Sequence, residues 1–213
     1  VYTVTVNTAA LPEPITPGVD NKKPASKPEV KLPFTDVSTS DWFYDDVAFV
    51  YKNGLFSGTD SRSFSPNASM TRAMLVTVLY RLEGEPTVTG RSSFTDVRSG
   101  AYYEKAVIWA AANGIVTGTD STSFSPDAKV TREQLAAILY RYAQYRKLDT
   151  DASAKLNSFT DADSVSAYAS EALGWAVSEG LINGASGKLM PKGDATRAQV
   201  AAILHRLVKN VLN

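Results

Sequence analysis

The stretch Phe34-Thr35-Asp36-Val37 begins a pattern that the chain repeats three times. In the first copy it continues through Trp42, Gly54 and Gly58 to Thr71-Arg72. The equivalent positions in the later copies are Phe94, Tyr102, Gly114, Gly118 and Arg132, and then Phe159, Tyr168, Gly180, Gly184 and Arg197. A repeat of this length is a supersecondary unit too small to bury its own apolar face, so the copies must bury one another. We therefore expect a functional site to occur in triplicate.

Each copy is predicted to contain two helices joined by a glycine-bearing loop. The first helix is expected at about residues 45–53, 104–113 and 170–179, each followed by a Gly that adopts the left-handed C-cap conformation at no steric cost. The second helix opens at a Thr, which is a good N-cap: Thr71, Thr131 and Thr196. Gln134 and Gln199 complete a capping box in copies two and three, whereas Met74 in copy one does not.

The second helices carry the main apolar surface. Leu75, Val78, Leu79 and Leu82 follow the spacing i, i+3, i+4, i+7, and the other two second helices repeat it. Three equivalent stripes suit a three-helix bundle about a pseudo-threefold axis. The predicted fold is mostly α, with three repeats forming a pseudo-threefold three-helix bundle that carries three helix-loop prongs.

Composition excludes several classes of function. The 22 basic and 22 acidic residues balance, which argues against a nucleic-acid partner. No run of 18 apolar residues is present, so neither a transmembrane helix nor membrane insertion is expected. There is no Cys and a single His, His205, which we interpret as a half-buried ring on a packing helix. These absences predict no catalytic residue, no metal site and no cofactor.

The first 33 residues differ from the repeats. Residues 1–10 begin with the alternating stretch Val1–Val6 and are interpreted as the remnant of a preceding β domain. Residues 11–33 are Pro-rich and predict an extended linker. The repeats are assigned to residues 34–90, 91–150 and 151–213, which together form one compact unit. An upstream domain of the same polypeptide is expected.

An arginine occupies the first position of each second helix: Arg72, Arg132 and Arg197. The helix macrodipole disfavours a cation there by about 0.3 to 1 kcal/mol. One explanation is an ion pair with an aspartate that recurs in step: Asp36, Asp96 and Asp161. The other is a site for an anionic ligand, because helix N-terminal amides and a guanidinium together bind a carboxylate or phosphate well. Spacing alone leaves both open.

An aromatic residue and a glycine also recur beside this arginine. The aromatic positions are Trp42, Tyr102 and Tyr168, which in such places belong to a core more often than to a ligand platform. A flat ring beside Arg would nevertheless hold a sugar. The glycines are Gly58, Gly118 and Gly184, which supply either a positive φ or close approach of a ligand to the main chain. The acids Asp45, Asp46 and Glu171 are not matched between copies, which argues against a glycoside hydrolase.

Taken together, these motifs resemble the surface-layer homology repeat. The resemblance covers Phe34 to about Leu207 and rests on Phe-Thr-Asp-Val, the aromatic, Asn-Gly, Phe-Ser-Pro and Thr-Arg. It implies a non-catalytic anchor of a secreted bacterial protein, located extracellularly at the cell surface. The implied partner is a secondary cell-wall polysaccharide, anionic and often bearing pyruvylated N-acetylmannosamine, held in grooves between prongs. It also implies that Arg72, Arg132 and Arg197 hold the ketal carboxylate.

The chain departs from the family pattern at defined positions. The Glu that follows Arg-Ala in the family is replaced by Met74, Gln134 and Gln199. Copy three has Ala162 after Phe-Thr-Asp, and Leu189-Met190-Pro191 in place of Phe-Ser-Pro. We therefore expect the three grooves to differ in affinity. The alternative function is a protein-protein or lattice assembly module that does not bind glycan.

Overall fold

The computed structural model describes residues 31–212. In this part of the chain the helices are α1 (Tyr44–Lys52), α2 (Arg72–Leu82), α3 (Glu104–Ala112), α4 (Arg132–Tyr145), α5 (Ser170–Ser178) and α6 (Arg197–Leu207). Single turns of 3₁₀-helix, η1 (Leu156–Ser158), η2 (Ala162–Ser164) and η3 (Ala167–Ala169), precede α5, and a π-helical turn, η4 (Val208–Leu212), follows α6. The described residues form isolated β-bridges but no extended strand, which confirms the mostly α prediction.

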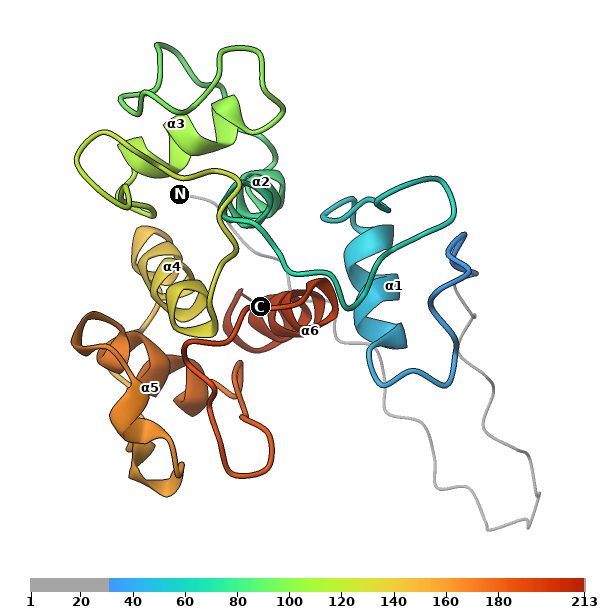
Figure 1. Ribbon diagram of the computed structural model, residues 1–213, viewed down its shortest axis with the longest axis vertical. Helices are drawn as coiled ribbons and strands as arrows, with labels where there is room; N and C mark the ends of the chain where they lie inside the picture. Colours follow the sequence, from blue (N-terminus) through green and yellow to red (C-terminus); the bar gives the residue numbers. More distant parts are fainter. Residues whose placement is uncertain (1–30, 213) are drawn as a thin grey trace, which may run out of the picture. The chain divides into compact units, whose positions relative to one another are not determined.

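The helices are arranged with threefold pseudosymmetry (Figure 1). The second helices, α2, α4 and α6, surround the centre, and the first helices, α1, α3 and α5, lie outside them. Each outer helix packs on a central helix of another repeat: α3 on α2, α5 on α4, and α1 on α6. The repeats are therefore interlocked, and the last one closes on the first.

Just before the second helices begin, a triangle of backbone hydrogen bonds joins the three repeats. The Met70 amide donates to the Ala195 carbonyl, the Ala195 amide to the Val130 carbonyl, and the Val130 amide to the Met70 carbonyl, each at 2.9 Å. Met70 and Val130 are fully buried, so these polar groups need internal partners. The triangle requires all three copies, which explains why the repeats form one unit.

The helix ends follow the sequence signals. The Thr71, Thr131 and Thr196 hydroxyls accept the amides of Met74, Gln134 and Gln199, and only the last two complete the capping box. Gly54, Gly114 and Gly180 have φ of 68°, 69° and 67°, as the C-cap prediction requires.

Aromatic contacts seal the junctions between outer and central helices. Tyr80 packs on Trp109 and Tyr140 on Trp175, with ring centroids 5.7 and 5.6 Å apart. At the closing junction His205 stacks on Phe49 at 4.1 Å, and its Nδ1 lies 2.7 Å from Asp46 Oδ1. The interpretation of His205 as a half-buried packing residue is confirmed.

The prediction of a β remnant at residues 1–10 lies outside the described residues. So does the Pro-rich linker, except for Lys31, Leu32 and Pro33.

Candidate functional site

The three repeated arginines are buried, with exposed fractions of 6%, 8% and 6% for Arg72, Arg132 and Arg197. Each reaches into a loop of the following copy, where its Nε donates to one backbone carbonyl. The acceptors are Phe124 (2.8 Å) for Arg72, Leu189 (2.7 Å) for Arg132 and Phe64 (2.7 Å) for Arg197. Burial lowers the pKa of all three guanidinium groups, and neighbouring aspartates partly oppose this shift. These arginines therefore join repeats to one another.

The helix N-terminal amides are not available to a ligand. The first two amides of each second helix donate to carbonyls of a neighbouring repeat, as Arg72 does to Ala128 and Ala73 to Pro126. The third amide is capped by the Thr hydroxyl. The expectation that these amides help to bind an anion is therefore wrong, because the interface between repeats uses them.

The recurrent aspartates do not form the predicted ion pairs with the arginines in the described part of the chain. Asp36 instead accepts the amides of Phe64 and Ser65, both at 2.8 Å, and holds Ser65 at a φ of 57°. Asp96 and Asp161 do the same for the equivalent turns. The same turn carries the carbonyl that Arg197 binds. Aspartate and arginine thus hold one strained loop from opposite sides.

The repeated aromatic residues lie at the surface. Trp42, Tyr102 and Tyr168 are 64%, 64% and 55% exposed, although core positions are the commoner environment for such residues. The residue that follows them provides the core contact, since Phe43, Tyr103 and Ala169 are buried. Exposed rings at three equivalent positions each present an apolar face to solvent.

The repeated glycines are required by packing. A Cβ at Gly58, Gly118 or Gly184 would lie 2.7, 2.9 or 2.8 Å from a ring carbon of the Phe that opens the same repeat. Gly184 also has a φ of 69°, whereas Gly58 and Gly118 do not adopt a positive φ. Close packing of the loop backbone and the Phe ring therefore explains why glycine stands at these three positions.

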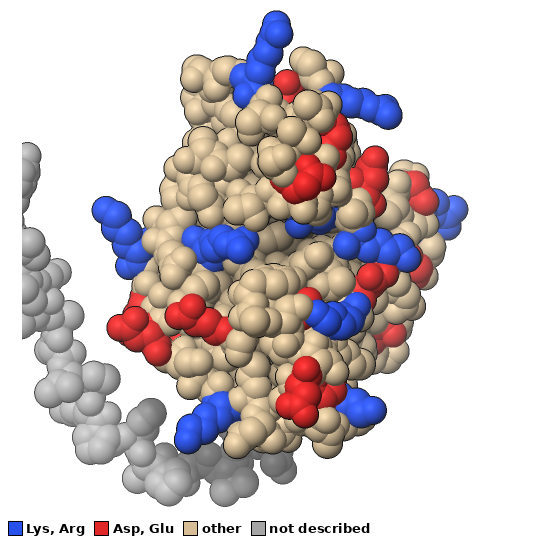
Figure 2. Space-filling model, turned by 60° about the vertical axis from the view of Figure 1, so that its left-hand side comes forward, with Lys and Arg blue, Asp and Glu red and all other residues tan. Residues whose placement is uncertain are grey.

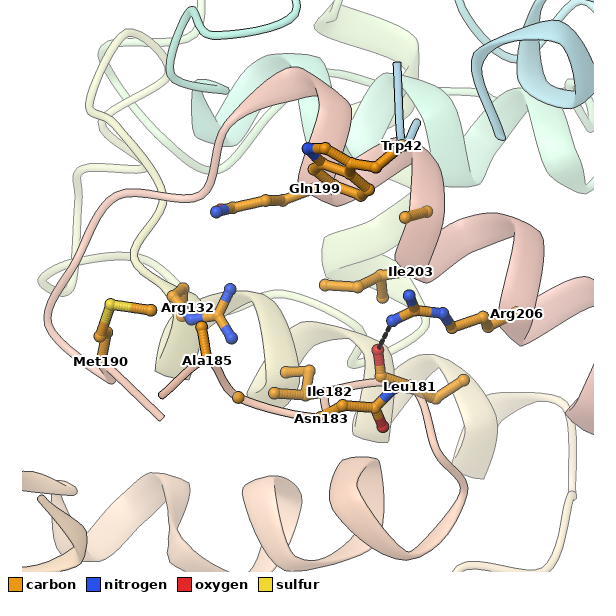
Figure 3. A pocket seen from close by; sticks show the side chains of 12 residues that line it. Trp42, Arg132, Leu181, Ile182, Asn183, Ala185, Met190, Gln199, Ile203 and Arg206 are labelled. Atoms are coloured by element: carbon orange, nitrogen blue, oxygen red, sulfur yellow. Dashed lines mark hydrogen bonds between the residues drawn. The ribbon is translucent and has the colours of Figure 1, made fainter. Parts of the chain in front are cut away.

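One pocket brings the three repeats together (Figure 3). Copy one supplies Trp42, copy two supplies Arg132, and copy three supplies Gln199, Arg206 and the loop 181–185. We call it the Trp42 pocket. Its volume is about 200 Å³. Pockets for drug-sized ligands start at about 300 Å³, so this one suits a smaller group such as a single sugar ring.

Arg132 differs from its equivalents within this pocket. Arg72 and Arg197 use Nη2 for a second carbonyl, Thr117 at 3.0 Å and Ser57 at 2.7 Å, and stack on phenylalanine rings. No such bond joins the terminal nitrogens of Arg132 to the described residues, and Leu189 replaces the ring. Figure 3 shows its guanidinium pointing into the pocket.

The structure adds a second set of arginines that the sequence interpretation passed over: Arg81, Arg141 and Arg206. Arg206 lines the Trp42 pocket and donates to the Leu181 carbonyl at 3.1 Å, and Arg81 makes the equivalent bond to Leu55. Their recurrence at one position of each second helix was the available signal.

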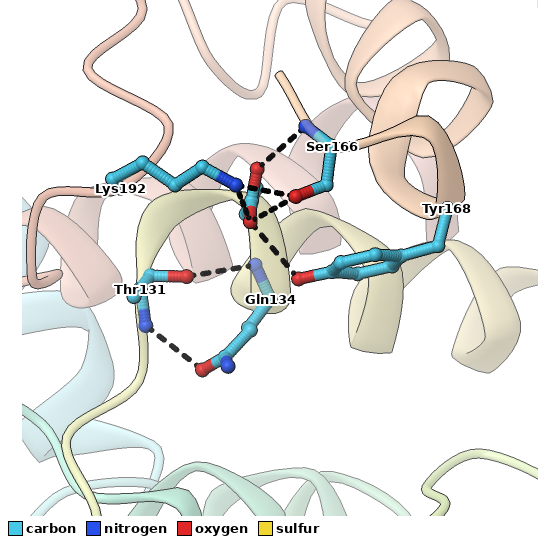
Figure 4. A network of polar contacts seen from close by, with 6 residues as sticks. Thr131, Gln134, Ser166, Tyr168 and Lys192 are labelled. Atoms are coloured by element: carbon cyan, nitrogen blue, oxygen red, sulfur yellow. Dashed lines mark hydrogen bonds and ion pairs between the residues drawn. The ribbon is translucent and has the colours of Figure 1, made fainter. Parts of the chain in front are cut away.

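A buried carboxylate was also missed. Glu133 stands where the other copies have Ala73 and Ala198, and its side chain is 5% exposed. It accepts hydrogen bonds from the Ser166 amide and hydroxyl, the Tyr168 hydroxyl and Lys192, over 2.7–3.1 Å (Figure 4). Burial would raise the pKa of Glu133, but these bonds outweigh it and lower the pKa. We call these four residues the Glu133 network.

Charge is mixed over the rest of the surface. On the face in Figure 2, several Lys and Arg side chains lie along a hollow at mid-height, with acidic groups on both sides. Among residues 31–212 no helix combines the length and apolarity needed to span a bilayer. The same residues contain no cluster of three His, Cys, Asp or Glu side chains suited to a metal ion.

The repeats of this chain are similar in sequence to known proteins. A family model described as the S-layer homology domain matches residues 33–73, 93–136 and 158–201. A surface-layer 125 kDa protein of Lysinibacillus sphaericus is 32% identical over 165 residues, 74% of this chain and 13% of that protein. A cellulosome-anchoring protein of Acetivibrio thermocellus is 26% identical over 115 residues, 52% of this chain and 26% of that protein.

An enzyme is also similar over this region. An endoglucanase of Bacillus sp. (strain KSM-635) is 31% identical over 181 residues, which are 84% of this chain and 19% of the enzyme. The chain therefore spans about a quarter or less of each of these relatives.

Proposed function

Because this chain belongs to the S-layer homology family and is associated with the cell surface or cell wall, we propose that it anchors its parent protein by binding an anionic cell-wall polysaccharide. The anchoring itself is the role of the family. The identity of the ligand is the part that we infer. The proposed contacts are the exposed aromatics, together with Arg132 and Arg206, which line the Trp42 pocket.

The observation that supports this proposal most strongly is the composition of the Trp42 pocket. A Trp that is 64% exposed offers a flat apolar face for a sugar ring. Arg132 and Arg206 line the same pocket, and guanidinium groups bind carboxylates and phosphates through paired hydrogen bonds. Gln199 adds a neutral donor and acceptor suited to hydroxyl or acetamido groups.

A pyruvylated amino sugar fits these groups. Its ketal carboxylate would pair with an arginine, while its ring and acetamido group would meet Trp42 and Gln199. The chain needs no catalytic group for this role, and the endoglucanase relative is matched over 19% of its length. We therefore assign an anchoring role and no turnover to the chain.

Co-sedimentation with purified bacterial cell-wall sacculi tests the proposal. The chain should pellet with sacculi that carry their secondary polymer and remain in solution with sacculi from which that polymer has been stripped. Equal pelleting with both preparations, or with neither, would contradict it. Self-association in the absence of polysaccharide would instead support the assembly-module alternative.

Trp42→Ala is the informative variant, with Tyr51→Ala as the matched control. Tyr51 is also a partly exposed aromatic residue, at 37%, but it does not line the pocket. We expect Trp42→Ala to weaken pelleting by ~tenfold or more, as removal of a central aromatic contact does at other interfaces, and Tyr51→Ala to retain it. Equal retention by the two variants would remove Trp42 from the site.

A further inference from the structure

The three equivalent sites differ in charge beside the aromatic residue. The lining of the Trp42 pocket contains two arginines and no carboxylate. At Tyr102, burial raises the pKa of the hydroxyl; Thr71 lowers it, and nearby Asp127 raises it further. At Tyr168, burial and then Glu133 raise the pKa to about 12. Arginines oppose both shifts: Arg81 at Tyr102, and Arg141 and Arg72 at Tyr168. The Tyr168 site therefore stands apart through the buried Glu133 carboxylate, which is hydrogen-bonded to its aromatic hydroxyl.

The Glu133 network also uses up the polar groups at Tyr168. The Tyr168 hydroxyl already donates to Glu133 at 3.1 Å, and Lys192 contacts the same carboxylate at 2.7 Å (Figure 4). A ligand would have to break these bonds to use either group. Ala73 and Ala198 hold the corresponding positions in the other copies, so nothing comparable forms there.

The three repeated arginines also differ in how many hydrogen bonds their guanidinium groups make to the neighbouring repeat. Arg72 and Arg197 each give two nitrogens to carbonyls of the neighbouring repeat and stack on its rings. In the described part of the chain, the guanidinium group of Arg132 is hydrogen-bonded only through Nε. Its terminal nitrogens face the Trp42 pocket.

The backbone of the loop beside Arg132 differs from that of the equivalent loops in copies one and two. Gly184 has a φ of 69°, whereas Gly58 and Gly118 lie outside the positive-φ region. The carbonyl of the preceding residue accepts the second arginine bond in copies one and two, through Ser57 and Thr117, but Asn183 does not accept one. The altered loop of copy three thus leaves Arg132 with one carbonyl partner, where Arg72 and Arg197 have two.

From these observations, and on the basis of the proposed function, we propose that the Trp42 pocket is the principal anion-binding site of the three. Arg132 is its ligand-contacting guanidinium, while Arg72 and Arg197 serve mainly to join repeats.

Acrylamide quenching of tryptophan fluorescence tests this assignment directly. The chain has three Trp, and Trp109 and Trp175 are 4% and 0% exposed, so quenching reports mainly on Trp42. A pyruvylated N-acetylmannosamine glycoside, titrated in parallel by calorimetry, is the probe. We expect the heat of binding and the protection of Trp42 from quenching to saturate together. Heat of binding without protection would overturn the assignment and leave the proposed function standing.

Absence of any binding would instead overturn the proposed function.

Substitution of the aromatics then ranks the sites: Trp42→Ala should weaken binding by ~tenfold or more, and Tyr168→Ala by ~threefold or less. Arg132→Lys keeps the charge but loses the planar fork, and should weaken binding by ~tenfold while the near-ultraviolet circular dichroism remains native. Equal losses for Trp42→Ala and Tyr168→Ala would contradict the proposal.

Discussion

The Trp42 pocket and the Tyr168 site occupy equivalent places in the threefold arrangement, yet their polar side chains make different hydrogen bonds. At Tyr168 the aromatic hydroxyl, a lysine and a buried glutamate bind one another, and Arg72 is held by two carbonyls. In the Trp42 pocket, Arg132 has one such bond and no carboxylate lines the cavity. The comparison shows that one motif can serve either to join repeats or to face a ligand, according to its neighbours.

The largest expected effect concerns the two kinds of arginine. Arg197→Ala should lower the free energy of unfolding by about 3–5 kcal/mol, because it removes two hydrogen bonds from a buried cation to carbonyls. Arg132→Ala should cost about 1.5–3 kcal/mol, since one such bond is lost. Urea unfolding followed by circular dichroism measures both. Equal losses would mean that the second hydrogen bond of Arg197 adds nothing to the free energy of unfolding.

The second prediction concerns the loop glycine that recurs at an equivalent position in each copy. Gly118→Ala should destabilise the chain by about 2–3 kcal/mol, because the new Cβ would overlap Phe94 and loop carbonyls. Gly193→Ala is the control, as its nearest neighbour would lie at 3.3 Å and its φ is not positive. Thermal unfolding compares the two. A Gly118→Ala chain of normal stability that no longer binds wall polymer would restore the ligand-approach interpretation.

The third prediction tests the Glu133 network through pH. Its folded pKa lies below the ordinary value of 4.5, so its contribution is complete above that pH and is lost as pH falls through the folded pKa. At pH 7, Glu133→Ala should cost about 1–2 kcal/mol in hydrogen bonds.

The difference between the wild type and Glu133→Ala should therefore shrink as the solution is acidified below pH 4.5. Melting temperatures of both proteins, measured over this range, provide the check. A constant difference would show that the carboxylate is not ionised in the folded chain.

The smallest expected effect on stability is at Trp42. Because its side chain is 64% exposed, Trp42→Ala should change the free energy of unfolding by no more than about 0.5 kcal/mol. Its expected loss of glycan binding would then arise from the site and not from the fold. A clear drop in melting temperature would mean that the ring supports packing, as its T-shaped contact with Phe43 would allow.

Much of the fold was predictable because its signals are local. The repeat boundaries, the Thr caps, the capping boxes at Gln134 and Gln199 and the Gly C-caps all depend on residues within one turn. The roles of the repeated polar residues were less accessible. Asp36 and Arg197 act on one loop although they stand at opposite ends of the described chain, and no spacing within a repeat reveals this.

By itself, the sequence determined that three similar units must share a core, and which residues recur at their edges. Only the tertiary structure decided which of those residues face solvent and which are buried and hydrogen-bonded at the interfaces between repeats. The physical reason is that each site is assembled from three copies, so the bonding of Arg132 depends on the backbone at Gly184 and the environment of Tyr168 depends on Glu133. The threefold repeat determines the arrangement of the helices, and single substitutions between neighbouring copies determine which polar groups at each site are available to a ligand.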